Sequence, residues 1–362
     1  MTLAAQTKSR SVNVPAPHET PFMNGILHPA LWLWDSWVVR VDKTIHLYCL
    51  GLSRVSAEGL AITPFDFNNY PFHFRHFTST DEGHTWLDRG AVLHPGNLLD
   101  GADSANVWSG SVHHLPSGEI LFGYTGIDHP SPSRHFVQTI NFASGTSAGP
   151  TSFPKEADSH PVRDRDAIIA AGYYLPEAGL IGHNEGEGNG PILGWRDPFI
   201  FETPHGVLHA FWSGKVAPRT PAVAHAILHK AGHHWTLQLQ PPIRLPDDDE
   251  YTQAEVPKLC LDAQTGEFLM MISSCNRLHE QQADEEISKG LRLYRTKKIA
   301  GPWEAEFDHG SLIQGIDHLF GASFLDLEFT GNSFRIIAPY TIKATGRLPM
   351  SFAPLQTVKI NR

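Results

Sequence analysis

The stretch WLWDSWVVRVDKTIHLYCL, residues 32–50, joins a short acidic prelude to a β-hairpin. Its second half consists of two runs rich in Val, Ile and Tyr, which favour strands, separated by the turn-forming residues DKT. Hairpins of this kind recur along the chain, each with turn residues at its tip. The further copies occupy residues 111–124, 199–212, 258–272 and 324–338. Because helix signals are scarce between them, the sequence predicts an all-β protein.

A similar prelude precedes every hairpin. In chain order the preludes read WLWDS, NVWSGS, GWRDP, QAEVP and DHLFGAS. From Asp35 through Ser109, Asp197 and Glu255 to Phe320, the intervals are 74, 88, 58 and 65 residues, the size of a four-stranded propeller blade with variable loops. Five such units predict a five-bladed β-propeller, in which the preludes meet at one mouth of the central channel. A β-sandwich with regularly spaced hairpins is the alternative fold.

Length and composition fit a propeller of one domain. The 362 residues include 31 Gly and 27 Pro, and 18% of the chain is charged, which indicates a turn-rich globular protein. We predict a single propeller domain over residues 26–362, preceded by an N-terminal arm over residues 1–25. The segment 74–90 reads as an outer-blade hairpin, in which we expect Asp81 and Asp88 to be solvated turn acids.

Charge and hydropathy narrow the range of partners. A formal net charge of −10 argues against a nucleic-acid partner, which would require clustered Lys and Arg, and favours a small, neutral carbohydrate ligand. No run approaches the roughly 18 apolar residues of a spanning helix, so no membrane partner is predicted. The start, MTLAAQTKSRSVNVPAP, lacks the apolar core of a signal peptide. The default expectation is a cytoplasmic protein, with export by an unconventional route as the alternative.

No metal or cofactor is predicted. Three scattered cysteines suit neither a disulfide framework nor a CxxC zinc site, so we expect reduced, buried thiols. His225 and His229 have helical ligand spacing, but in a strand they would lie about 13 Å apart. The acidic run DDDE, residues 247–250, could attract calcium, although an acidic loop leading to Glu255 is the commoner case.

Asp35 stands among three tryptophans, Trp32, Trp34 and Trp37. Flat aromatic walls with a carboxylate suit a sugar ring, whose faces are apolar and whose hydroxyls need an acceptor. A structural reading is also open, since Trp and Val form strands and an Asp ahead of a strand is often a turn residue.

The preludes resemble the signatures of glycoside hydrolase family 68, the levansucrases, inulosucrases and β-fructofuranosidases, and more distantly the family 32 invertases. The similarity rests on WDSW, WSGS, WRDP and the Glu in QAEVPK, between residue 32 and about residue 280. It implies a retaining mechanism on β-fructofuranosides, typically sucrose. By this resemblance Asp35 is the nucleophile, Asp197 stabilises the transition state, and Glu255 is the general acid/base.

The same resemblance implies a set of substrate-binding residues. Four match positions that wall or hydrogen-bond the fructosyl unit, and two lie toward the leaving group and acceptor: Trp34, Trp108, Ser109 and Arg196, then Gln253 and Arg277. The chain departs from the levansucrase pattern at Gln253 and Val256, where an acidic residue and an arginine are usual. The chain is also short for the family, which predicts an open pocket that favours water or small acceptors.

The chemistry also follows from the residues alone. Cleavage of a ketofuranoside passes through an oxocarbenium-like state, so one carboxylate should attack while an acid about 5 to 5.5 Å away protonates the leaving oxygen. We expect a bidentate Arg196 to orient Asp197 and keep it ionised. If Glu255 is not the acid, Glu250 and Asp317 are the next candidates. Two other functions stay open: an inverting furanosidase acting on arabinosides or xylosides, and a non-catalytic carbohydrate-binding propeller.

Overall fold

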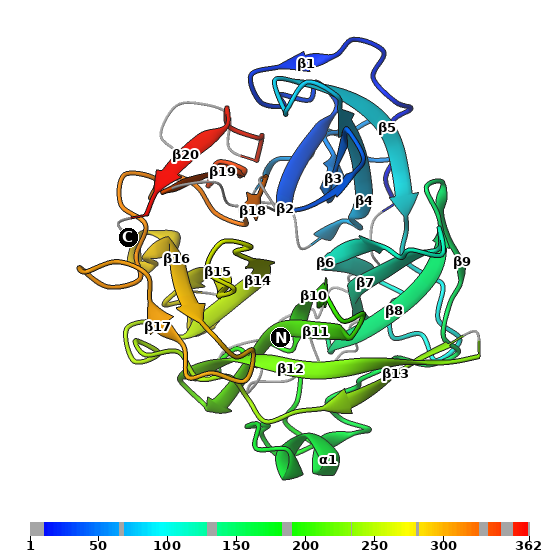
Figure 1. Cartoon of the computed structure of the whole chain (residues 1–362). Coiled ribbons are helices and arrows are strands. Elements are labelled where there is room, and N and C mark those ends of the chain that lie inside the picture. Colours follow the sequence, from blue (N-terminus) through cyan, green and yellow to red (C-terminus); the bar gives the residue numbers. More distant parts are fainter. Residues whose placement is uncertain are drawn as a thin grey trace.

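Five small sheets stand around a common axis (Figure 1). The computed structural model describes residues 11–64, 69–128, 136–182, 190–232, 234–279, 282–325, 332–341 and 350–360. Within each sheet the strands follow one another in chain order from the axis outward, apart from one additional edge strand in the first blade. The predicted five-bladed β-propeller is therefore confirmed, and the sandwich alternative is excluded.

Blades I to III each have at least four strands. Blade I has an additional edge strand, β1 (Phe22–Met23), outside β5. Its others are β2 (Leu31–Val41), β3 (Thr44–Ser53), β4 (His73–Ser79) and β5 (Thr85–Leu93). Blade II consists of β6 (Asn106–His114), β7 (Ile120–Ile127), β8 (Gln138–Thr146) and β9 (Gly149–Ser152). Blade III, which follows the short helix α1 (Arg165–Ala170), consists of β10 (Arg196–Glu202), β11 (Leu208–Ala217), β12 (Thr220–Ala231) and β13 (His234–Leu239).

Blades IV and V complete the ring. Blade IV consists of β14 (Gln253–Leu261), β15 (Phe268–Cys275), β16 (Lys289–Thr296) and β17 (Glu304–Ala305), with the 3-10 helix η2 (Asp284–Glu286) before β16. Blade V consists of β18 (Ser323–Phe324), β19 (Ser333–Ile337) and β20 (Gln356–Lys359). The predicted hairpins are thus the two inner strands of each blade. The tip of the fifth hairpin, residues 326–331, lies outside the described residues.

The ring closes between blades V and I. The innermost strands contact one another in sequence, and β18 of blade V contacts β2 of blade I. Ser36 N donates to the carbonyl of Gly321 at 2.9 Å, and Leu33 N donates to Met350 O at 2.7 Å. Ile26 and Phe352 exchange a pair of backbone hydrogen bonds. These bonds fix the relative position of the first and last preludes.

Apolar side chains fill the five gaps between blades. Each gap has its own buried cluster: Trp37 with Phe122 between blades I and II, Trp195 with Leu121 between II and III, and Phe211 with Met270 between III and IV. Similar clusters join blades IV to V and V to I. The strand faces that point into these gaps are apolar and buried. The blades therefore cannot slide relative to one another without exposing this core.

The outer hairpin of blade I corrects one expectation. Asp81 is exposed and caps its turn through Thr85. Asp88, however, is not solvated, because its side chain is fully buried and pairs with the equally buried Arg75 at 2.5 Å. Arg75 also donates to the carbonyls of Pro15 and Ala16. The residues that cover Asp88 come from the preceding strand and from the N-terminal segment, so the local turn sequence does not reveal them.

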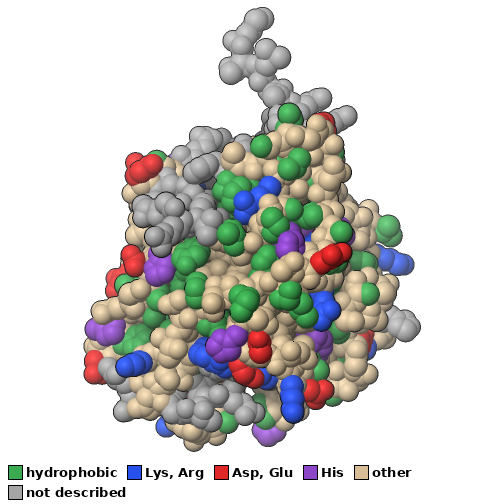
Figure 2. Space-filling model, turned by 90° about the horizontal axis from the view of Figure 1, so that it is seen from above, with side chains coloured by type: hydrophobic (Ala, Val, Ile, Leu, Met, Phe, Trp, Pro, Cys, Tyr) green, Lys and Arg blue, Asp and Glu red, His purple; other side chains and the backbone are tan. Residues whose placement is uncertain are grey.

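The surface carries both signs of charge. On the face shown in Figure 2, Lys and Arg side chains lie interspersed with Asp, Glu and His side chains. Within the part of the chain that the structure describes, no helix has the length and apolar character needed to cross a membrane. The three cysteines are buried thiols, as expected.

Candidate active site

A β-bulge interrupts each of the first four inner strands at its prelude. The strand register shifts at Asp35, at Ser109, between Arg196 and Phe199, and between Glu255 and Lys258. Each bulge inserts an extra residue that redirects the neighbouring side chains. The backbone is strained at several of these points, because three residues that are not glycine have a positive φ. The values are 21° at Asp35, 66° at Asp197 and 43° at Val256. Strain repeated at equivalent positions of several blades points to a functional site.

The fifth prelude provides a glycine where no other residue fits. Gly321 has φ of +60°, and a Cβ added to it would lie only 2.1 Å from Oδ1 of Asp35. Its own N–H donates to Ser273 Oγ at 2.9 Å. Gly321 therefore lets blade V approach the Asp35 carboxylate directly, which a side chain would prevent.

Asp35 is held from the neighbouring blade. Ser109 Oγ donates a short hydrogen bond to Asp35 Oδ2, which joins the first and second preludes. Burial raises the pKa of Asp35, while the hydrogen bond from Ser109 and the charges of Lys258 and Arg196 oppose that rise and Glu255 adds to it. Asp35 therefore lies within electrostatic range of the residues of the third and fourth preludes.

Arg196 links the other two predicted acids. Its Nη2 donates to Glu255 Oε1, its Nη1 donates to Gln138 Oε1 at 3.3 Å, and its Nε lies 3.7 Å from Asp197 Oδ2. The expected bidentate clamp of Arg196 on Asp197 is therefore wrong: the guanidinium spans two carboxylates. The bulge after Glu255 brings that side chain within reach of Nη2, so Asp197 is left with the longer contact.

Asp197 is buried deeply beside this arginine. Its backbone N–H donates to Thr125 Oγ1 at 2.7 Å, and its Oδ2 accepts from Val256 N at 3.2 Å. Burial raises the pKa of Asp197 to about 7, reinforced by the charges of Asp35 and Glu255 and opposed by Arg196. Burial and the neighbouring carboxylates thus outweigh the arginine, contrary to the expectation that Arg196 keeps Asp197 ionised.

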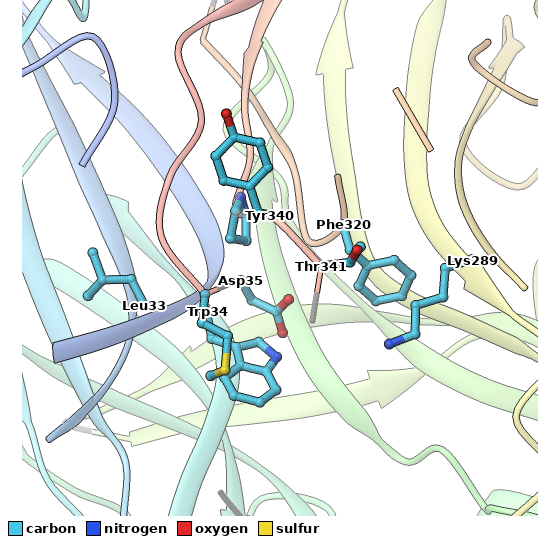
Figure 3. Close-up of a pocket in the computed structure, with 9 residues that line it drawn as sticks. Leu33, Trp34, Asp35, Lys289, Phe320, Tyr340 and Thr341 are labelled. Atoms are coloured by element: carbon cyan, nitrogen blue, oxygen red, sulfur yellow. The ribbon is translucent and has the colours of Figure 1, made fainter. Parts of the chain in front are cut away.

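A pocket beside Asp35 is lined by residues of blades I, IV and V, among them Trp34, Lys289, Phe320 and Tyr340 (Figure 3). Of the three tryptophans around Asp35, only Trp34 lines it. Trp34 lies beside the Asp35 carboxylate (Figure 3) and packs edge-on against Phe72, with ring centroids 5.5 Å apart. Trp37 is buried in the core, and Trp32 is covered by the guanidinium of Arg54. The bulge at Asp35 puts all three rings on one face of blade I, since they pair with Leu52, Leu50 and Tyr48 of β3. Their positions along the strand therefore decide which ring reaches the pocket.

No family model matches the chain, and no curated protein matches it. Among solved structures, Bacillus subtilis levansucrase is 14% identical with a TM-score of 0.63, over 99% of this chain and 90% of that chain. The chain has the levansucrase fold. An inulosucrase from Halalkalicoccus jeotgali bound to kestose is 15% identical with a TM-score of 0.63, over 98% of this chain and 90% of that chain.

A levansucrase variant complexed with sucrose is also similar, with 14% identity and a TM-score of 0.61, over 92% of this chain and 85% of that chain. The resemblance that the preludes indicated is therefore confirmed at the level of the fold. This fold places the first strand of each blade around the axis, which explains how tetrapeptides far apart in sequence come into contact there.

The remaining predicted residues take different positions in this fold. Trp108 is half-buried, edge-on to Phe136 at 5.2 Å between centroids. Gln253 is 1% exposed, and its Nε2 donates to the backbone carbonyl of Arg277 at 3.2 Å. Thr252 Oγ1 donates to the same carbonyl at 2.6 Å. Gln253 therefore supports the segment that carries Arg277. Contacts of Gln253 and Arg277 with substrate stay predictions. The catalytic roles of the three acids also stay predictions.

Sequence reasoning missed several residues of the site. Thr125 joins two blades, since it donates to Ser109 O and accepts from Asp197 N. Lys258 is buried near the acids, and Lys289 projects into the pocket against Phe320, its Nζ 5.4 Å from the ring centroid (Figure 3). Gly321 lies within the fifth prelude, and Lys258 directly follows the fourth. The available signals were therefore a glycine close to the axis and a lysine after a Pro-containing bulge. No signal in the sequence pointed to Thr125 or Lys289.

The acidic and histidine-rich segments have structural partners. Asp247 and Glu250 both pair with Arg292, at 2.5 and 2.7 Å, so the acidic run before Glu255 is balanced by an arginine. His225 stacks on Phe211, and His229 contacts Gln238. No group of three or more His, Cys, Asp or Glu suited to a metal ion occurs among the described residues.

Proposed function

We propose that the chain is a retaining glycosidase and fructosyltransferase that acts on β-fructofuranosides such as sucrose through a covalent fructosyl–enzyme intermediate. One observation carries the proposal: carboxylates from three separate inner strands converge, with Arg196 between Asp197 and Glu255 and with Asp35 held by Ser109. A residue with positive φ lies at or next to each of these acids, namely Asp35, Asp197 and Val256, and Asp197 is buried. Such an arrangement costs stability and is typical of an active site.

Asp35 has the properties of the nucleophile. Ser109 and Gly321 restrict its carboxylate on two sides, and a fixed attacking oxygen removes much of the entropic cost of the reaction. In the first step an Asp35 oxygen forms a bond to the anomeric carbon as the glycosidic bond breaks. The electron pair of that bond goes to the leaving oxygen, which takes a proton from Glu255.

Glu255 has the reach that the acid/base role needs. Its side chain is 16% exposed, against 6% for Asp197, so it lies closer to the solvent side where a leaving group departs. In the second step Glu255 takes a proton from water or from a sugar hydroxyl, which attacks the anomeric carbon and releases Asp35. Asp197, deeper in the pocket, is positioned to accept hydrogen bonds from fructosyl hydroxyls.

Hydrolysis and transfer to small acceptors are both compatible with this site. Gln253 and Val256 offer neither an acidic group nor a guanidinium on the acceptor side, and Gln253 is occupied by the Arg277 carbonyl. We therefore propose that acceptor choice is loose and that water competes effectively with sugar hydroxyls.

The decisive experiment incubates the purified chain with sucrose and measures glucose and fructose separately. Equal amounts indicate hydrolysis, and an excess of glucose indicates transfer. Proton NMR at early times identifies the anomer first released, and β-fructofuranose is expected. The inverted anomer, or cleavage of arabinosides or xylosides alone, would favour the inverting alternative, because inversion is incompatible with a covalent Asp35 ester. Sugar binding without any cleavage would indicate a non-catalytic propeller.

A further inference from the structure

Lys258 is a buried cation beneath the site for which the proposed reaction has no assigned role. It is 2% exposed, and its Nζ donates to Val256 O at 3.4 Å and lies 5.5 Å from the ring centroid of Phe199. In a regular strand, Glu255 and Lys258 would point to opposite faces. The bulge between them inserts one extra residue, so both side chains face the axis.

The bulge connects Lys258 to Asp197 through a single residue. The backbone N–H of Val256 donates to Asp197 Oδ2 at 3.2 Å, while the carbonyl of Val256 accepts from Lys258. The positive φ of 43° at Val256 turns these two groups in different directions. The strained residue thus holds a carboxylate on one side and an ammonium group on the other.

The two cations of the site serve different acids. Arg196 donates to Glu255 and Gln138, whereas Asp35 forms no ion pair within 4 Å in the described part of the chain and receives the Ser109 hydroxyl. Burial raises the pKa of Asp35, and among the charges that oppose this rise the contribution of Lys258 exceeds that of Arg196. Burial also lowers the pKa of Lys258 to about 8, against the raising influence of Asp35 and Asp197.

We propose that Lys258 is a positioning residue whose buried ammonium group keeps the Asp35 carboxylate charged and, through Val256, holds the Asp197 carboxylate in place when substrate binds. The charges that act on Lys258 are those of Asp35 on β2 and Asp197 on β10, and Arg196 and Glu255 lie beside these acids. This inference rests on the proposed function, in which Asp35 must be ionised to attack.

The net charge of the carboxylates around Lys258 changes when Asp35 forms its ester. Before attack, the ammonium group faces the Asp35 carboxylate and, above about pH 7, the Asp197 carboxylate as well. Once Asp35 has formed its ester, it is neutral, and Lys258 is left with Asp197 in a balanced pair. Lys258 keeps its proton throughout, so no proton transfer is assigned to it. Its effect is to favour the reactive, ionised form of Asp35 in a site that burial would otherwise neutralise.

The test follows the ionisation of Asp35 directly in the full chain. Aspartate labelled with ¹³C at Cγ is incorporated, and the Asp35 signal is assigned by its loss in Asp35→Asn. In Lys258→Met the titration midpoint of Asp35 is expected to rise by about one pH unit, and kcat/KM for sucrose at the acidic limb should fall about tenfold with KM nearly unchanged. Lys215→Met is the matched control, because Lys215 is an equally buried lysine, 1% exposed, whose Nζ donates to the carbonyl of Pro218 at 3.1 Å. That control should titrate like the wild type.

A second variant covers the case in which Lys258→Met does not fold. Lys258→Arg keeps the charge but cannot lose a proton in the accessible range. In the wild type the aspartate signals should show a further inflection near the Lys258 pKa of about 8, and this inflection should vanish in Lys258→Arg. Persistence of the inflection, or an Asp35 midpoint in Lys258→Met equal to that of the wild type, would overturn the role of Lys258.

Failure of the two proposals can be told apart. A shifted Asp35 midpoint in a protein that cleaves no sucrose would refute the proposed function while leaving the charge coupling established. An unshifted midpoint in an enzyme that cleaves sucrose would refute the role of Lys258 alone.

Discussion

Two buried arginine–carboxylate clusters in this propeller differ in how fully their carboxylates are supplied with donors. In blade I, Asp88 accepts from Arg75 Nε at 2.8 Å, Arg75 Nη2 at 2.5 Å, His18 N at 2.7 Å and Gly90 N at 3.0 Å. At the axis, the described residues offer the Asp197 carboxylate one hydrogen bond, from Val256 N, and a contact of 3.7 Å with Arg196.

The pKa values of the two acids move in opposite directions for this reason. Burial alone would raise the pKa of Asp88, but hydrogen bonds from His28, Arg75 and His18 N and the Arg75 charge lower it well below its usual range. Burial raises the pKa of Asp197 to about 7. Asp88, whose carboxylate accepts at least four hydrogen bonds, holds the N-terminal segment on blade I. Asp197 accepts only one from the described residues, so its carboxylate can still accept hydrogen bonds from substrate hydroxyls.

The largest expected effect is that of Asp35→Asn. The amide keeps the shape of the carboxylate but cannot form the fructosyl ester, so sucrose cleavage should fall by about 10⁴-fold or more. Thermal unfolding should be unchanged or occur at a higher temperature, because a buried charge is removed. Activity within tenfold of the wild type would contradict the nucleophile assignment.

Glu255→Ala should have the next largest effect, and it depends on the leaving group. Cleavage of sucrose should drop by about 10³-fold, because the glucosyl oxygen needs a proton, while β-fructosyl fluoride should lose much less activity. Azide should intercept the intermediate and partly restore turnover of the fluoride. Equal losses on both substrates would move the search to Glu250 or Asp317, which are both exposed.

Arg75→Met tests the structural cluster. Removal of the arginine leaves Asp88 buried without its main partner and releases the carbonyls of Pro15 and Ala16. We expect a loss of about 3 kcal/mol in the free energy of unfolding, measured by denaturant titration. Activity per folded molecule should stay at the wild-type level, and a selective loss of kcat would show that the two clusters are coupled.

Gly321→Ala should affect the nucleophile through geometry alone. The new Cβ would lie 2.1 Å from Asp35 Oδ1, so the carboxylate must move, and kcat should fall by about 10²-fold. Gly315→Ala is the matched control, because Gly315 also has a positive φ, +79°, but no atom within 4 Å of an added Cβ. If both variants lose activity equally, backbone strain and not contact with Asp35 is responsible.

The sequence predicted what depends on local pattern. Five turn-tipped hairpins and their spacing sufficed for the propeller, and the prelude positions sufficed to place Asp35, Asp197 and Glu255 on the innermost strands of their blades. The side-chain partners were harder to predict, because a bulge reverses the alternation of side chains between the two faces of a strand. By simple alternation Lys258 would point away from Glu255, but the bulge puts both on the same face. Asp88 read as a turn acid for a similar reason, since the N-terminal segment that covers it lies about 70 residues away in sequence. A local bulge set the first outcome, and a contact between distant segments set the second.

The smallest expected effect compares the two clusters through pH. The Asp197 pKa is raised from 3.8 to about 7, so its contribution to stability is present below pH 4 and is lost as pH rises through 7. Asp197→Asn does not titrate, and its melting temperature relative to the wild type should rise by about 2 °C between pH 5 and pH 8. The Asp88 pKa is lowered instead, so the contribution of Asp88 is fully present throughout that range. Asp88→Asn should therefore show a constant deficit from pH 5 to pH 8, which shrinks only below pH 4. A flat difference for Asp197→Asn would mean that Asp197 is ionised across the range, and the contrast between a saturated and an undersupplied carboxylate would fail.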